Sequence, residues 1–140
     1  MKTVYLAAPL FSEAECDFNR KLKGELHSLG FKVFLPQEDS NNVHDRTNRQ
    51  KIIFNKNLTG IENSDILIAV IDGADVDSGT SWEIGYAFAK GKPVIGLRTD
   101  FRTLGSEGTM NLMIERSVIL CISISELLNL LLSMTDTRIK

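Results

Sequence analysis

The stretch that decides the fold runs from residue 65 to residue 85 and reads DILIAVIDGADVDSGTSWEIG. Its apolar run, Ile66 to Ile71, is short, rich in β-branched residues and bounded by aspartates, as expected of a strand buried on both faces of a parallel sheet. Asp72, Asp77 and Glu83 follow in a loop and in the first turns of a helix. Because open α/β sheets bind ligands at the carboxyl ends of their strands, we predict the active site here.

Short apolar runs and helical patterns alternate along the rest of the chain. Ser12 is placed to cap the first helix, with Glu15 completing a capping-box pattern. The expected strands cover residues 3–8, 31–35, 66–71, 93–97 and 117–122. The expected helices cover residues 12–29 and 46–63, surround Glu83 as far as residue 90, and begin again near residue 125, with loops over 37–45 and 98–109.

This alternation predicts parallel strands joined by right-handed helical crossovers. A chain of 140 residues has the length of one domain. We therefore predict an α/β fold, in which a single domain over residues 1–140 forms a doubly wound five-stranded parallel sheet. The expected strand order is the flavodoxin-like 2-1-3-4-5.

Composition and charge limit the possible partners. The net charge is −2 and the sequence has no basic cluster, so neither a nucleic acid polymer nor a membrane surface is an expected partner. No apolar stretch is long enough to span a bilayer and no signal peptide is evident. We expect a cytoplasmic protein that acts on a small molecule.

Cofactor and metal motifs are also missing from the sequence. The first expected strand is followed by Pro9-Leu10-Phe11 and not by a glycine-rich phosphate loop, and Gly91-Lys92 precedes a proline. The two histidines and two cysteines lack ligand spacing. Three carboxylates could hold magnesium, as in phosphate-accepting receiver domains, but the early acidic pair of those domains is absent. We expect neither a cofactor nor a metal.

The last expected helix is apolar around most of its girth. A helix of this kind needs cover on more than one side. In a small domain we expect a subunit interface to supply that cover and predict a homo-oligomer; the alternative is burial within the monomer. The residues concerned are Leu127, Leu128, Leu130, Leu131 and Leu132.

The acidic residues favour nucleophilic carboxylate chemistry. A carboxylate can attack an anomeric carbon and form a glycosyl-enzyme intermediate. Glu83 follows a helix start, where the helix dipole favours the ionised form, so we expect a fully charged nucleophile. Asp72 or Asp77 could manage the proton of the leaving group. Small residues such as Gly79 would let a substrate approach the backbone closely.

Three motifs together resemble the nucleoside 2-deoxyribosyltransferase family. They are Tyr5-Leu-Ala-Ala-Pro-Leu-Phe11, the pattern Asp72-Gly-x4-Asp77-x-Gly79-Thr80-x2-Glu83-x-Gly85, and Asn111-x-Met113. The resemblance extends from Val4 to about Ser117. It implies a retaining double displacement that exchanges free nucleobases on 2′-deoxynucleosides.

The resemblance also implies a role for each matching residue. Glu83 would take the 2-deoxyribosyl group, and Tyr5 would hydrogen-bond and orient it. Asp72 and Asp77 would contact the base and manage its proton. The substrate-binding set would be completed by Leu10, Phe11, Gln37 and Gly79, together with Asn111 and Met113, which would reach the 5′ side of the sugar across a subunit interface.

Two other functions stay open. Related enzymes of this fold hydrolyse 2′-deoxynucleoside 5′-monophosphates and bind the phosphate with serines, for which Ser78, Ser106 and Ser117 are candidates. Asn111 favours a free 5′-hydroxyl instead. The second alternative is a non-catalytic nucleotide-binding module, in which loss of Glu83 would leave binding intact.

Overall fold

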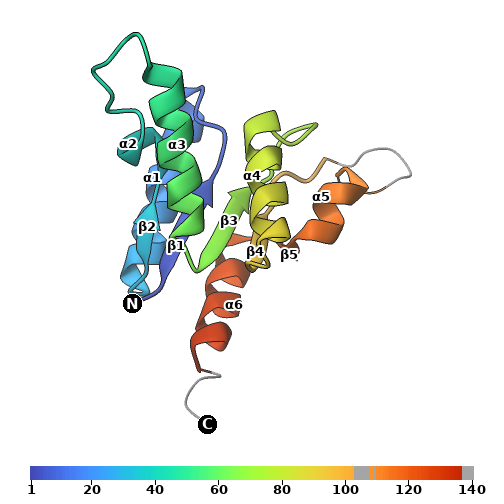
Figure 1. The fold of residues 1–140 in the computed structure, drawn as a ribbon. Coiled ribbons are helices and arrows are strands. Elements are labelled where there is room, and N and C mark those ends of the chain that lie inside the picture. Colours follow the sequence, from blue (N-terminus) through green and yellow to red (C-terminus); the bar gives the residue numbers. More distant parts are fainter. Residues whose placement is uncertain (103–107, 109, 137–140) are drawn as a thin grey trace.

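Five parallel strands form the centre of the molecule, in the order β2-β1-β3-β4-β5 (Figure 1). The computed structural model describes residues 1–102, 108 and 110–136. The predicted fold class and strand order are confirmed. The strands are β1 (Thr3–Ala7), β2 (Lys32–Phe34), β3 (Ile66–Val70), β4 (Val94–Leu97) and β5 (Ile119–Cys121).

Helices cover both faces of this sheet. The helices are α1 (Glu13–Ser28), α2 (Pro36–Asp39), α3 (Arg49–Glu62), α4 (Ser78–Ala89), α5 (Leu112–Ser117) and α6 (Ile124–Asp136). Side chains alternate between the faces of a strand, so Val4 and Leu6 of β1 join the core under α1 and α6, whereas Tyr5 and Ala7 join the core under α3 and α4.

The central strand β3 behaves as its sequence indicates. All five of its residues are buried, and it pairs with β1 on one side and β4 on the other. The capping box at the start of α1 is also present, since Ser12 Oγ accepts from the Glu15 amide and the Glu15 carboxylate accepts from the Ser12 amide. These local signals therefore place the carboxyl ends of β1 and β3 side by side.

The loop expected over residues 37–45 differs in its first part. Residues 36–39 form the short helix α2, with Pro36 at its first turn, where a missing amide hydrogen costs nothing. The next helix begins at Arg49, three residues later than expected. Asp45 Oδ1 accepts from the amides of Thr47 and Asn48 at 2.9 and 3.2 Å, and this local turn competes with the first helical turn.

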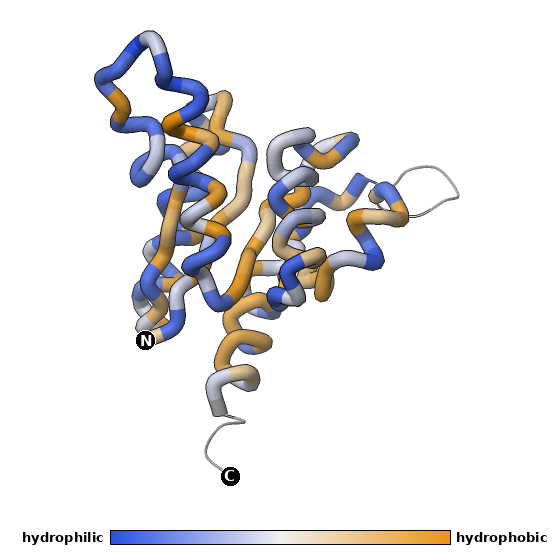
Figure 2. Tube along the Cα trace, in the orientation of Figure 1, coloured by the Kyte–Doolittle hydropathy of each residue, from blue (hydrophilic) through white to orange (hydrophobic). Residues whose placement is uncertain are grey.

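The apolar helix α6 is covered largely by its own chain. Figure 2 shows it as a mostly hydrophobic segment. Leu127 and Leu131 are fully buried, and Leu128 and Leu130 pack against the same core, so burial in the monomer accounts for them and only Leu132 is exposed. Burial within the monomer, the alternative reading, therefore accounts for most of these leucines, and a subunit interface at this helix stays a prediction. Other large exposed apolar side chains among the described residues are Met1, Phe11, Phe54, Trp82, Phe88, Phe101, Leu112, Met113, Ile119 and Ile122.

Membrane-spanning helices are not among the elements that the structure describes: none of these helices has both the length and the apolar character to cross a bilayer.

Candidate active site

A tyrosine and a glutamate form the centre of the site. The Tyr5 hydroxyl donates a hydrogen bond to Glu83 Oε1 at 2.9 Å, across 78 residues of sequence. Tyr5 is fully buried in β1, which neighbours β3, and Glu83 lies in the second turn of α4, the helix that follows β3 and covers that face. The hydrogen bond implied by the family resemblance is thus present.

Burial sets the protonation of this pair. Desolvation raises the pKa of Glu83 to about 7, the Tyr5 hydrogen bond opposes that rise, and the negative charge of Asp77 adds to it. Burial and the charge of Glu83 also raise the pKa of Tyr5, which keeps the hydroxyl protonated as a donor. Desolvation thus opposes the expected fully ionised form of Glu83, which lies beyond the first turn of α4, where the helix dipole is weak.

Asp77 fixes the start of α4 beside this pair. Its Oδ2 accepts from the Thr80 amide at 2.9 Å and from Thr80 Oγ1 at 3.0 Å, so it is the N-cap. A Cβ added at Gly79 would lie 3.3 Å from Asp77 Oδ2, which makes a small residue appropriate there. The structure therefore places Asp77, Gly79 and Glu83 at the N-cap and in the first two turns of α4.

Two adjoining cavities open onto Glu83. One, of about 200 Å³, is lined by Ala8, Leu10, Phe11, Pro36, Ser40, Asn41, Ile53, Asn57, Asp77, Gly79, Thr80 and Glu83. The other, of about 220 Å³, is lined by Phe54, Asn57, Leu58, Ile61, Gly79, Trp82 and Glu83. The predicted residues Leu10, Phe11, Asp77 and Gly79 thus share a cavity with Glu83. Among the described residues, neither lining contains a lysine or an arginine.

Helix α3 contributes a residue that sequence reasoning missed. Asn57 lines both cavities, and its Oδ1 is buried without a hydrogen-bond partner among the described residues. A buried acceptor without a partner is costly unless a ligand or water satisfies it. No sequence signal identified Asn57, because a lone asparagine on an amphipathic helix normally faces solvent.

Asp72 does not lie with the other two predicted carboxylates, Asp77 and Glu83. It lines a separate cavity of about 300 Å³ on the α1 side of the sheet, together with Asp100 and Arg102. Its carboxylate accepts from the Thr99 amide and hydroxyl, both at 2.6 Å, and from the Asp100 amide at 2.8 Å. The predicted grouping of three carboxylates is therefore corrected to two, because Asp72 holds the loop after β4.

Gln37 is also engaged elsewhere. Its Oε1 accepts from Asn19 at 2.9 Å and its Nε2 donates to the Cys16 carbonyl at 3.1 Å. Gln37 lines neither cavity with Glu83, so the structure does not place it as a base-binding residue. Asn19, which is buried, also donates to the Pro9 carbonyl and so ties the loop carrying Leu10 to α1 and α2.

Asn111 and Met113 lie at the surface. Asn111 caps α5 by accepting from the Met113 amide at 2.9 Å, and Met113 is 69% exposed. Neither lines the cavities at Glu83 within this chain, so a contribution to a neighbouring subunit stays a prediction. Of the candidate serines, Ser78 is exposed, Ser117 donates to the Met113 carbonyl, and Ser106 lies outside the described residues.

Metal binding finds no support within the described ranges, where no group of three or more histidine, cysteine, aspartate or glutamate side chains could hold an ion.

Comparison with known proteins bears directly on this geometry. The sequence model of the nucleoside 2-deoxyribosyltransferase family matches residues 4–118, most of the chain and all of the site described above. The chain belongs to this family. No curated protein matches it.

Solved structures of similar proteins agree with the family. A conserved protein from Enterococcus faecalis V583 is 29% identical, with a TM-score of 0.81, and the match covers 92% of this chain and 96% of that one. The 2-deoxyribosyltransferase from Bacillus psychrosaccharolyticus is 28% identical, with a TM-score of 0.79 and coverage of 91% and 90%. A 2-desoxiribosyltransferase from Leishmania mexicana, 24% identical with a TM-score of 0.70 and coverage of 89% and 93%, shares the fold.

Proposed function

We propose that this member of the family is a nucleoside 2-deoxyribosyltransferase that exchanges nucleobases on 2′-deoxyribose through a covalent intermediate on Glu83. The observation that carries the proposal is the part-buried Tyr5–Glu83 hydrogen bond, because Glu83 lines cavities that Asp77 and Gly79 also line. A buried carboxylate with a raised pKa, positioned by a second side chain, is typical of a catalytic group.

The reaction needs two steps at the anomeric carbon. Ionised Glu83 attacks C1′, the bond between C1′ and the base breaks, and the base leaves with the bonding electron pair and takes up a proton. A second base then attacks C1′, regenerates the Glu83 carboxylate and loses its own proton. Asp77 is our candidate for handling these protons, and the unpartnered Asn57 Oδ1 is suited to accept a hydrogen bond from the substrate.

The charge of the cavities favours a nucleoside over a nucleotide. In the part of the chain that the structure describes, the carboxylates of Asp77 and Glu83 line these cavities and no lysine or arginine does. A 5′-phosphate there would lack a cationic partner and would face like charges, which disfavours binding. The negative charge of these cavities therefore favours transfer between nucleosides over hydrolysis of 2′-deoxynucleoside 5′-monophosphates.

A homo-oligomer completes the proposal. Asn111 and Met113 are exposed and remote from the cavities of their own chain, as expected if they serve the sugar's 5′ side in a neighbouring subunit. We expect the enzyme to work without a cofactor in the cytoplasm.

The test is a pair of incubations followed by chromatography. One contains the protein, deoxyinosine and free adenine, and the other contains the protein and deoxyinosine 5′-monophosphate without an acceptor. We expect deoxyadenosine and hypoxanthine in the first, and little free base in the second. Free base released only from the monophosphate would overturn transfer in favour of hydrolysis.

Two variants assign the chemistry. Glu83→Ala should abolish exchange, whereas Asp72→Asn, which alters a carboxylate outside these cavities, should retain most of it. Equal turnover in Glu83→Ala and the wild type would exclude the covalent role of Glu83.

A further inference from the structure

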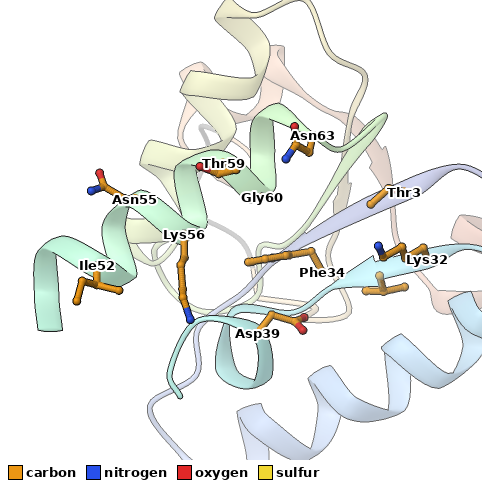
Figure 3. A pocket seen from close by; sticks show the side chains of 11 residues that line it. Thr3, Lys32, Phe34, Asp39, Ile52, Asn55, Lys56, Thr59, Gly60 and Asn63 are labelled. Atoms are coloured by element: carbon orange, nitrogen blue, oxygen red, sulfur yellow. The ribbon is translucent and has the colours of Figure 1, made fainter. Parts of the chain in front are cut away.

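A cavity larger than the two at Glu83 lies between α3 and the edge strand β2. It has a volume of about 660 Å³, a size that suits a small organic ligand. Figure 3 shows Phe34 beneath α3, with Lys56 extending from the helix on one side of its ring and Lys32 lying on β2 on the other. Its lining is Thr3, Lys32, Val33, Phe34, Asp39, Ile52, Asn55, Lys56, Thr59, Gly60 and Asn63.

Positive charge and hydrogen-bond donors dominate this lining. The side-chain ammonium groups of Lys32 from β2 and Lys56 from α3 have no ion-pair or hydrogen-bond partner among the described residues. The one carboxylate, Asp39, already accepts from the Leu35 amide at 2.7 Å through Oδ2. The cavity therefore carries a net charge of about +1 in a chain whose net charge is −2.

Phe34, in the apolar part of the cavity, packs against Tyr5 of the Tyr5–Glu83 pair. The rings of Phe34 and Tyr5 stack with centroids 5.3 Å apart and planes 12° apart. Tyr5 in turn donates to Glu83. A ligand in contact with Phe34 would therefore be separated from the Glu83 hydrogen bond by the two stacked rings of Phe34 and Tyr5.

We propose that this cavity binds a phosphoryl group, either free or carried by a small organic molecule. Lys32 and Lys56 supply two ammonium groups from different elements, and Asn55, Thr59 and Asn63 add neutral polar groups at the rim. Lysine binds phosphate as a point charge. Val33, Phe34 and Ile52 offer an apolar surface for an organic part. The inference does not depend on the reaction at Glu83.

The test follows backbone amide signals by NMR while AMP, inorganic phosphate or adenosine is added to the full chain. Binding at the cavity should shift the amides of Val33 and Gly60, whereas binding at the proposed active site should shift that of Gly79. The variant Lys32→Ala/Lys56→Ala is paired with Lys21→Ala/Lys51→Ala, which removes the same charge from exposed positions outside the cavity.

We expect AMP to shift Val33 and Gly60 saturably, and adenosine to leave them unchanged. The cavity variant should weaken AMP binding by about tenfold or more, and the control variant by less than about twofold. Equal affinity for AMP and phosphate would support a site for the free ion, and tighter binding of AMP a site for organic phosphates. Absence of shifts at about 10 mM, shifts confined to Gly79, or equal weakening by both variants would overturn the proposal.

Discussion

The cavities at Glu83 and the cavity at Lys32 and Lys56 differ in charge although the Tyr5–Phe34 stack connects them. The first are lined by two carboxylates without a cation, and the second by two lysines and one carboxylate. One side therefore suits a neutral nucleoside and the other suits an anion. One face of the sheet therefore carries cavities of different charge, which the stacked rings of Phe34 and the buried Tyr5 separate.

Helix α3 contributes to both regions. Asn57 lines the cavities at Glu83, whereas Lys56, Thr59 and Gly60 line the other. Successive helical residues point about 100° apart, so neighbours in sequence can face different cavities. A change on this helix can therefore alter one region, or both through the aromatic stack.

The largest expected effect concerns the charge of Glu83. Its pKa in the folded protein is about 7, above the usual 4.5, so its favourable contribution to folding is complete below pH 4.5 and is lost as the pH rises through 7. Glu83→Gln should therefore raise the free energy of unfolding by up to about 3 kcal/mol at pH 8 and by much less at pH 4.5. Urea denaturation at both pH values measures this, with Glu25→Gln of α1 as control. A gain in stability that is the same at the two pH values would contradict it.

The next effect tests the hydrogen bond within the pair. Tyr5→Phe removes the donor that stabilises the charged form of Glu83, so the pKa of Glu83 should rise above 7. We expect kcat/KM for base exchange at pH 7 to fall roughly 10- to 100-fold, and the deficit to narrow at higher pH.

Tyr86→Phe is the matched control for that measurement. Tyr86 donates to Glu62 at 2.6 Å, but this pair lies at the surface and outside the cavities at Glu83. Its kcat/KM profile against pH should follow that of the wild type. Identical profiles for Tyr5→Phe and Tyr86→Phe would show that the Tyr5 hydroxyl does not act through Glu83.

A smaller effect tests the aromatic stack between the two regions. A Cβ at Gly60 would lie 2.9 Å from Phe34 Cε1, so Gly60→Ala must displace the ring that stacks on Tyr5. Overpacking costs about 1–3 kcal/mol, which outweighs the gain of about 1 kcal/mol from replacing a helical glycine. Thermal unfolding should therefore show a small net loss.

Gly24→Ala provides the comparison, because a Cβ at Gly24 in α1 meets nothing within 4 Å. This variant should gain about 0.5–1 kcal/mol. If the two variants changed stability equally, the contact between Gly60 and Phe34 would not constrain the ring.

The smallest effect distinguishes the two aspartates. Asp77→Asn preserves an N-cap side chain but removes a negative charge that raises the pKa of Glu83. The acid limb of the kcat/KM profile should move to lower pH by less than about one unit. Asp72 does not line these cavities, so Asp72→Asn should leave the acid limb of the kcat/KM profile unchanged. If the acid limb shifted in Asp72→Asn and not in Asp77→Asn, then Asp72, and not Asp77, would be the aspartate whose charge acts on Glu83.

Much of the fold could be predicted from local pattern. The apolar run at β3, the capping box at Ser12 and Glu15, and the regular alternation of elements led to the correct sheet order. The start of α3 was misplaced, because the Asp45 turn depends on side-chain hydrogen bonds that a periodic pattern does not contain. The sequence could not decide between the monomer core and a subunit interface as the cover of α6, because an apolar pattern does not say which neighbour packs against a helix.

The sequence by itself determined the fold class, the family motifs and the nucleophile candidate, since these depend on residue type and short spacing. Only the tertiary structure decided which carboxylates meet. Asp72 and Asp77 are five residues apart, yet one holds the loop after β4 and the other caps α4 beside Glu83. It also brought Asn57 to Glu83 and raised the pKa of that glutamate, because burial and contacts between distant segments exist only once the sheet is assembled.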